Sequence, residues 1–140
     1  MIFESVYAEG KLHEMAQELL ERFESENLWL FKGEVGAGKT TLIKALVSAM
    51  GLDDEVTSPT FGLVNTYGGG AKQVHHFDLY RVESIDELEE VGFGSYIEQG
   101  TCFIEWPEIL AESITPPFVL IEIKKVTATQ RKLKATIILD

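Results

Sequence analysis

Cysteine is nearly absent from this sequence, and its scarcity excludes several classes of protein. Cys102 is the single cysteine, so no disulfide can form within the chain, and no neighbouring thiols or histidines give it the spacing of a zinc site. No stretch approaches the ~20 apolar residues of a membrane-spanning helix. The opening segment MIFESVYAEGKLHE lacks the basic start and the apolar core of a signal peptide. We therefore expect a protein of the reducing cytoplasm with no membrane partner.

Positive charge is also scarce. Twelve lysines and arginines stand against 23 aspartates and glutamates, which gives a formal net charge of -11. A protein that binds nucleic acid unaided must neutralise phosphates with cations, so this balance argues against direct nucleic-acid binding. The plain interpretation is an acidic, well-solvated surface, and the alternative is attraction to a basic protein partner.

The length and the apolar content are those of one folded unit. The chain has 140 residues and is 45% hydrophobic, which is enough for one domain with a real core. No internal repeat, low-complexity tract or domain boundary interrupts it, so we expect residues 1–140 to form a single domain. An amphipathic stripe predicts a helix over residues 10–24. That stripe consists of Leu12, Met15, Ala16, Leu19, Leu20 and Phe23.

Apolar runs and alternation predict most of the remaining elements. The continuous apolar run at 28–31 predicts a strand buried on both faces, and the longer run at 40–50 predicts a helix. Ser84 and Glu87 match a capping box, which predicts a short helix ending near Gly92. The other strand-like segments are 61–67, 74–78, 101–104, 118–126 and 133–139.

The order of these segments predicts the fold class. A helix, a strand and a second helix are followed mainly by strands, and turn-forming residues join two pairs of those strands into hairpins. Such an order is typical of an α/β fold. We expect a single domain with a mixed β-sheet flanked by helices and a C-terminal β-hairpin.

One motif carries recognisable chemistry. The segment GEVGAGKT at 33–40 fits the phosphate-binding pattern G-x-x-x-x-G-K-[ST] in full, between a predicted strand and a predicted helix. Its glycines let backbone N–H groups turn onto phosphate oxygens, and the helix N-terminus favours the same anion. The alternative, a glycine-rich turn with a surface lysine, does not account for the strand–loop–helix context. We therefore expect the domain to be P-loop NTPase-like. The expected nucleotide-binding residues of this loop are Glu34, Val35, Gly36, Ala37, Gly38, Lys39, Thr40 and Thr41.

Phosphate chemistry at such a loop needs a cation and a metal ion. Lys39 would bring a compact positive charge to the β- and γ-phosphates, and the Thr40 hydroxyl would bind Mg²⁺. The metal also needs a carboxylate at the end of a neighbouring strand. Asp78 and Glu105 both end predicted strands, so with Lys39 they are the candidate catalytic residues. The alternative for each carboxylate is an ordinary place on the surface.

The segment TSPT at 57–60 lies where a GTPase carries its first switch. Its proline would stiffen it, and the hydroxyls of Ser58 and Thr60 could meet the metal or the γ-phosphate. An ordinary turn before a strand is an equally good interpretation of these residues.

Four motifs in a fixed order resemble one family. GEVGAGKTT, TSPTF, HFDLYR and FIEWPE, between Gly33 and Glu108, are similar to the bacterial P-loop ATPases of the TsaE (YjeE) type, which are needed to make threonylcarbamoyladenosine in tRNA. The resemblance implies a small α/β domain that binds ATP and Mg²⁺ and hydrolyses ATP slowly by itself. It also implies two partners, paralogous ASKHA-fold subunits, one of which transfers the threonylcarbamoyl group. tRNA would then be met only indirectly, through them.

The resemblance also implies roles for single residues. Thr40 and Glu105 would hold Mg²⁺, and Asp78 would be the essential acid near the γ-phosphate. His76, which begins HFDLYR, would support the site. The remaining implied positions are Trp106 beside the nucleotide, Arg131 near the adenine, Ser58 and Thr60 in a switch-like segment, and Glu9 near the base.

Three other functions compete with this interpretation. A small-molecule kinase would need several arginines to clamp phosphates, whereas Arg22, Arg81 and Arg131 are widely separated. A GTPase would need N-K-x-D and a D-x-x-G after Asp78, and the sequence has neither. A non-catalytic module whose partner surface is ordered by ATP remains open, and weak turnover with tight nucleotide binding would favour it.

Overall fold

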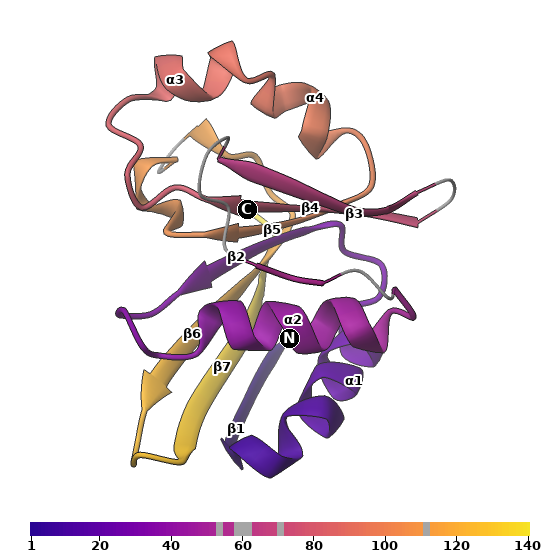
Figure 1. Cartoon of the computed structure of the whole chain (residues 1–140), viewed down its shortest axis with the longest axis vertical. Coiled ribbons are helices and arrows are strands. Elements are labelled where there is room, and N and C mark those ends of the chain that lie inside the picture. Colours follow the sequence, from indigo (N-terminus) through magenta and orange to yellow (C-terminus); the bar gives the residue numbers. More distant parts are fainter. Residues whose placement is uncertain (53–54, 58–62, 70–71, 111–112) are drawn as a thin grey trace.

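A computed structural model describes residues 1–52, 55–57, 63–69, 72–110 and 113–140. These residues form a seven-stranded mixed sheet in the order β1-β7-β6-β2-β5-β4-β3, with helices on both faces (Figure 1). The predicted α/β fold with its C-terminal hairpin is thereby confirmed. The elements are β1 (Ile2–Ala8), η1 (Glu9–Lys11), α1 (Leu12–Arg22), β2 (Leu28–Lys32), α2 (Lys39–Ala49), β3 (Val64–Gly69), β4 (Lys72–Asp78), α3 (Ile85–Glu90), α4 (Phe93–Ile97), β5 (Thr101–Glu105), η2 (Pro107–Ile109), β6 (Phe118–Lys125) and β7 (Gln130–Ile138).

The centre of the sheet is parallel. β4, β5, β2 and β6 run in the same direction, whereas β1, β7 and β3 pair antiparallel with their neighbours. Parallel strands end at the same edge of a sheet, which is where α/β proteins place their ligands. In this sheet Phe31 pairs with Glu105, and Glu105 pairs with Asp78, so the two predicted carboxylates end adjacent strands.

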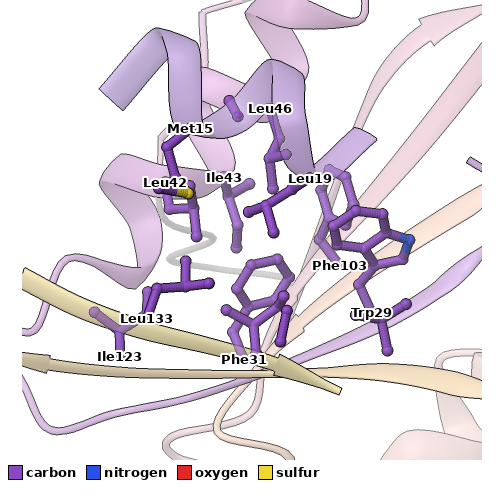
Figure 2. Close-up of a cluster of buried hydrophobic side chains, with 14 of the residues drawn as sticks. Met15, Leu19, Trp29, Phe31, Leu42, Ile43, Leu46, Phe103, Ile123 and Leu133 are labelled. Atoms are coloured by element: carbon purple, nitrogen blue, oxygen red, sulfur yellow. The ribbon is translucent and has the colours of Figure 1, made fainter. Parts of the chain in front are cut away.

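Helices α1 and α2 cover one face of the sheet. Figure 2 shows Leu19, Leu42 and Ile43 lying over Phe31 and other side chains of the sheet, and all are fully buried. Phe103 meets the Trp29 and Phe31 rings edge-on, with centroids 5.5 and 5.6 Å apart. Each large apolar side chain buried in this way contributes roughly 1.5–3 kcal/mol to stability. This packing fixes the helix that follows the P-loop against the strand that precedes it.

The shorter helices α3 and α4 pack on the other face, over a second cluster that contains Phe77 and Cys102. Phe77 contacts the rings of Phe93 and Tyr96 edge-on. Cys102 is fully buried, and burial raises the pKa of its thiol to about 12, so it is the inert core thiol that its apolar strand indicates. Within the ranges that the model describes, no helix is long and apolar enough to cross a membrane.

Two local predictions were wrong. The sequence order began with a helix, yet Ile2–Ala8 forms the edge strand β1, because alternate residues such as Phe3 and Tyr7 face the core while its backbone pairs with β7. Ser84 does precede a short helix, but its hydroxyl makes no capping hydrogen bond. The acidic Asp86 and Glu87 instead complement the helix dipole in the first turn.

Candidate functional site

The loop at 33–40 joins the end of β2 to the start of α2. Gly36 and Gly38 have φ values of 82° and 106°, in the left-handed region that glycine adopts without strain. Position 33 requires glycine for a steric reason, because a Cβ there would lie 2.8 Å from the carbonyl oxygen of Ile123. The loop therefore curls tightly over the first turn of α2, as a phosphate-binding loop must.

Lys39 lies inside that loop and is only 5% exposed. Its ammonium donates a hydrogen bond to the carbonyl oxygen of Gly33 and sits 3.4 Å from the centroid of the Trp106 ring. Burial lowers the pKa of Lys39, while Glu105, Glu108 and Asp78 oppose that shift. The site thus holds a partly desolvated cation beside carboxylates, an arrangement that an anionic ligand would complete.

A hydroxyl and a carboxylate meet directly beside the lysine. The Oγ1 atom of Thr40 lies 2.9 Å from each carboxylate oxygen of Glu105, whose side chain is 3% exposed. Such hard oxygen donors suit Mg²⁺, which takes one or two carboxylates together with substrate phosphates. Within the described residues no group of three or more histidines, cysteines or acidic residues could hold a metal. The ion would therefore depend on phosphate oxygens to complete its coordination.

Asp78 lies next to Glu105 in the parallel register and is half-buried. Its Oδ1 accepts a hydrogen bond from the backbone N–H of Tyr80 at 3.1 Å. Tyr80 belongs to the HFDLYR motif but had no predicted role, and its ring centroid lies 4.8 Å from that of Trp106. The signal for it is the LYR triplet, which follows the strand end directly.

Trp106 has an unusual backbone. It adopts φ 56° and ψ 58°, a left-handed conformation that is a true outlier for a bulky residue. Such strain persists only where the surroundings fix it, and it concentrates at functional sites. The turn projects the indole ring from the end of β5 over the ammonium of Lys39.

Arg131 reaches the P-loop from the terminal hairpin. Its Nε donates to the carbonyl oxygen of Ala37 at 2.9 Å, and its Nη1 donates to those of Thr127 and Gln130 at 3.1 Å each. The guanidinium therefore ties β7 to a loop 94 positions earlier in the chain. Arg131 also lowers the pKa of Tyr7, but burial dominates and raises that pKa to about 12.

These side chains surround a hollow of about 420 Å³. The predicted P-loop, carboxylate, tryptophan and arginine residues in the described ranges all line it except Ala37, whose carbonyl oxygen accepts a hydrogen bond from Arg131. His76 does not line the hollow but contacts Glu105, and Glu9 does not line it either: its backbone N–H donates to the carbonyl oxygen of Thr129. Ser58 and Thr60 lie outside the described residues. A second hollow, of about 480 Å³, lies along the outer side of the same loop beside β6, but neither the lysine nor the two carboxylates reach it. The hollow's lining residues are Glu34, Val35, Gly36, Gly38, Lys39, Thr40, Thr41, Asp78, Tyr80, Glu105, Trp106 and Arg131.

Comparison with known proteins agrees with the motifs. The model of the family described as threonylcarbamoyl adenosine biosynthesis protein TsaE matches residues 6–133. Among proteins named tRNA threonylcarbamoyladenosine biosynthesis protein TsaE, that of Rickettsia conorii is 30% identical over 125 residues, which are 89% of this chain and 71% of the relative. That of Bacillus subtilis is 35% identical over 106 residues, or 75% and 66% of the two chains.

A solved structure supports the fold. The crystal structure of YdiB from Bacillus subtilis superposes with a TM-score of 0.68 at 22% identity, covering 98% of this chain and 86% of that one. The family match spans nearly the whole chain, including the loop, both carboxylates and Arg131. From the motif order, the fold and these matches together, the chain belongs to the TsaE family.

Proposed function

We propose that this protein binds and slowly hydrolyses ATP with Mg²⁺ as part of the bacterial machinery that installs threonylcarbamoyladenosine in tRNA. One observation carries the proposal. The Thr40 hydroxyl lies 2.9 Å from both oxygens of Glu105, inside a P-loop whose lysine is buried. A structural turn has no need of a buried cation beside a buried carboxylate, because both are costly to desolvate.

Each site residue would have a separate role around a bound triphosphate. The loop N–H groups and the N-terminus of α2 would cradle the phosphates, and Lys39 would neutralise the β- and γ-oxygens. Thr40 and Glu105 would hold Mg²⁺, which when bound neutralises charge that develops on the phosphates. Asp78, the acidic neighbour of Glu105, would orient or deprotonate the attacking water. Such groups act mainly on the transition state, so they raise turnover more than affinity.

Family membership and charge support a proposal about the partners. We propose that the chain works in the cytoplasm with the two ASKHA-fold subunits that carry out threonylcarbamoyl transfer. A net charge of -11 disfavours direct binding to the tRNA backbone, so tRNA would be met through those subunits. Contacts to the γ-phosphate can order segments around it, so the ATP form should join the partners more tightly than the ADP form.

Two measurements test this proposal. Isothermal titration of the purified chain with ATP, ADP and GTP in Mg²⁺ should give tight binding of the adenine nucleotides, and phosphate release should be slow. A pull-down with labelled tRNA at near-physiological salt should retain tRNA only when both partner subunits are present. Failure to bind any nucleotide would refute the ATPase assignment, and strong capture of tRNA by the isolated chain would refute the indirect role.

A further inference from the structure

His76 is a buried polar residue at the edge of the site. It lies on β4 two residues before Asp78, so the side chains of both residues lie on the same face of the sheet. Its exposed fraction is 0%, and its Nε2 lies 2.6 Å from Oε2 of Glu105. The distance is short even for a hydrogen bond to an ionised group. Glu105 is thus held from two sides, by the hydroxyl of Thr40 and by this imidazole.

The imidazole of His76 donates a hydrogen bond through one of its nitrogens. An ionised carboxylate only accepts, so Nε2 carries the hydrogen and donates it to Glu105. Nδ1 is buried without a hydrogen-bond partner among the described residues. Burying an unpartnered polar atom is costly. What compensates for that cost at His76 is the single strong contact with Glu105.

The imidazole of His76 is enclosed by the core. The ring of Tyr67 on β3 lies 6.3 Å from it, centroid to centroid. The hydroxyl of Tyr67 is itself tied to the backbone of Thr57, donating to its carbonyl oxygen at 3.1 Å. His76 therefore has an anchored aromatic ring and a carboxylate among its neighbours.

We propose that His76 is a positioning residue for the metal, which fixes the Glu105 carboxylate in the orientation that Mg²⁺ requires. The inference rests on the proposed function, because it takes Thr40 and Glu105 as the protein ligands. A carboxylate that binds a metal needs its remaining lone pairs held, and loss of such a supporting contact typically weakens metal affinity 10–100-fold. A histidine with a merely structural role would contribute stability and leave metal affinity unchanged.

The adjacent residue supplies a matched control. His75 is also buried, at 3% exposure, but it faces away from the site. Its Nδ1 lies 2.9 Å from Oγ1 of Thr66, and its ring meets Tyr96 edge-on. Replacing either histidine removes a buried imidazole from the same strand, yet only His76 touches Glu105.

The test is binding of Mn²⁺, followed by electron paramagnetic resonance, to the full chain with a non-hydrolysable ATP analogue. Glutamine can place an N–H near the position of Nε2, whereas the shorter asparagine cannot reach Glu105. We expect His76→Asn to raise the Kd of Mn²⁺ about tenfold or more, and His76→Gln to stay within about threefold of wild type. His75→Gln should lower the urea midpoint without changing the Kd. If His76→Asn does not fold, His76→Phe replaces it, since phenylalanine keeps the ring and removes the donor.

The outcomes separate the two proposals. Equal Mn²⁺ affinity in wild type, His76→Asn and His76→Gln would overturn the positioning role while leaving the metal site intact. Equal weakening by the His75 and His76 variants would overturn it too, because stability alone would then explain the loss. If wild type with the nucleotide analogue binds no Mn²⁺, the proposed function itself fails.

Discussion

Removing the charge of Lys39 should weaken ATP binding much more than it changes the stability of the ligand-free fold. The methionine variant Lys39→Met keeps most of the side-chain stem beside Trp106 but loses the ammonium that donates to Gly33. Burial depresses the pKa of Lys39 in the folded state, so the charged form is disfavoured by folding at neutral pH. Stability linked to this group rises as the pH increases through the folded pKa towards the unfolded value of 10.5. Loss of the ammonium removes this desolvation cost but also removes the hydrogen bond to Gly33, so these effects oppose each other and the ligand-free variant should stay close to wild type in stability at pH 7.

The ATP-bound state should be affected much more strongly. Hydrogen bonds to charged groups contribute about 1.5–3 kcal/mol, so loss of the lysine should raise the Kd for ATP by roughly 10–150-fold. At an ATP concentration of about 100 times the wild-type Kd, ligand stabilises the folded protein by about 2.7 kcal/mol. A 100-fold rise in Kd would leave only about 0.4 kcal/mol. Hydrolysis should fall by a factor of about 10²–10³, as when other oriented charge-stabilising donors are removed.

The assay is urea unfolding with and without ATP and Mg²⁺, beside a phosphate-release measurement. Lys44→Met is the matched control, because Lys44 is an exposed lysine on the same helix, so the variant changes the net charge equally. Lys44→Met should retain the full ATP-induced shift and the full rate. An unchanged ATP-induced shift in Lys39→Met would refute the phosphate role. A large loss of ligand-free stability in Lys39→Met would refute the reasoning from its pKa.

Four further predictions concern the two carboxylates, the hairpin arginine and pH. Glu105→Gln should raise the Mg²⁺ concentration needed for half-maximal hydrolysis, because a neutral amide is a poorer ligand for a hard cation. Asp78→Asn should lower kcat more than it raises the Kd for ATP, and equal losses would make Asp78 a ground-state ligand. Arg131→Ala should weaken ATP more than inorganic triphosphate in a calorimetric titration if its guanidinium packs on adenine, whereas equal weakening would indicate that it acts only by holding the loop. Burial raises the pKa of Cys102 from 9.0 and of Tyr7 from 10.0, each to about 12. The free energy of unfolding should therefore fall as the pH rises from about 9 towards 12. A free energy of unfolding that stays constant over this range in urea titrations would contradict this.

The elements that the sequence predicted correctly are those whose signal is local. The apolar run at 28–31, the P-loop spacing and the helix at 40–50 each depend on neighbours a few positions apart. A continuous apolar run must be buried on both faces, and it became β2 at the centre of the sheet. The edge strand β1 escaped prediction because polar Glu4 and Ser5 interrupt its apolar pattern, and its partner β7 lies at the far end of the chain.

The sequence by itself determined which chemical groups this protein possesses, and the tertiary structure decided which of them meet. Alternation along β4 puts the adjacent histidines on opposite faces of the sheet, but only the parallel pairing of β4 with β5 puts His76 against Glu105. The same pairing joins Asp78 to Glu105, and the pairing of β6 with β7 brings Arg131 to the P-loop. Local patterns fix backbone conformation and the face on which a side chain lies, because they act within a turn or a strand. Contacts between distant segments depend on strand order and register, which arise only when the whole core is buried together.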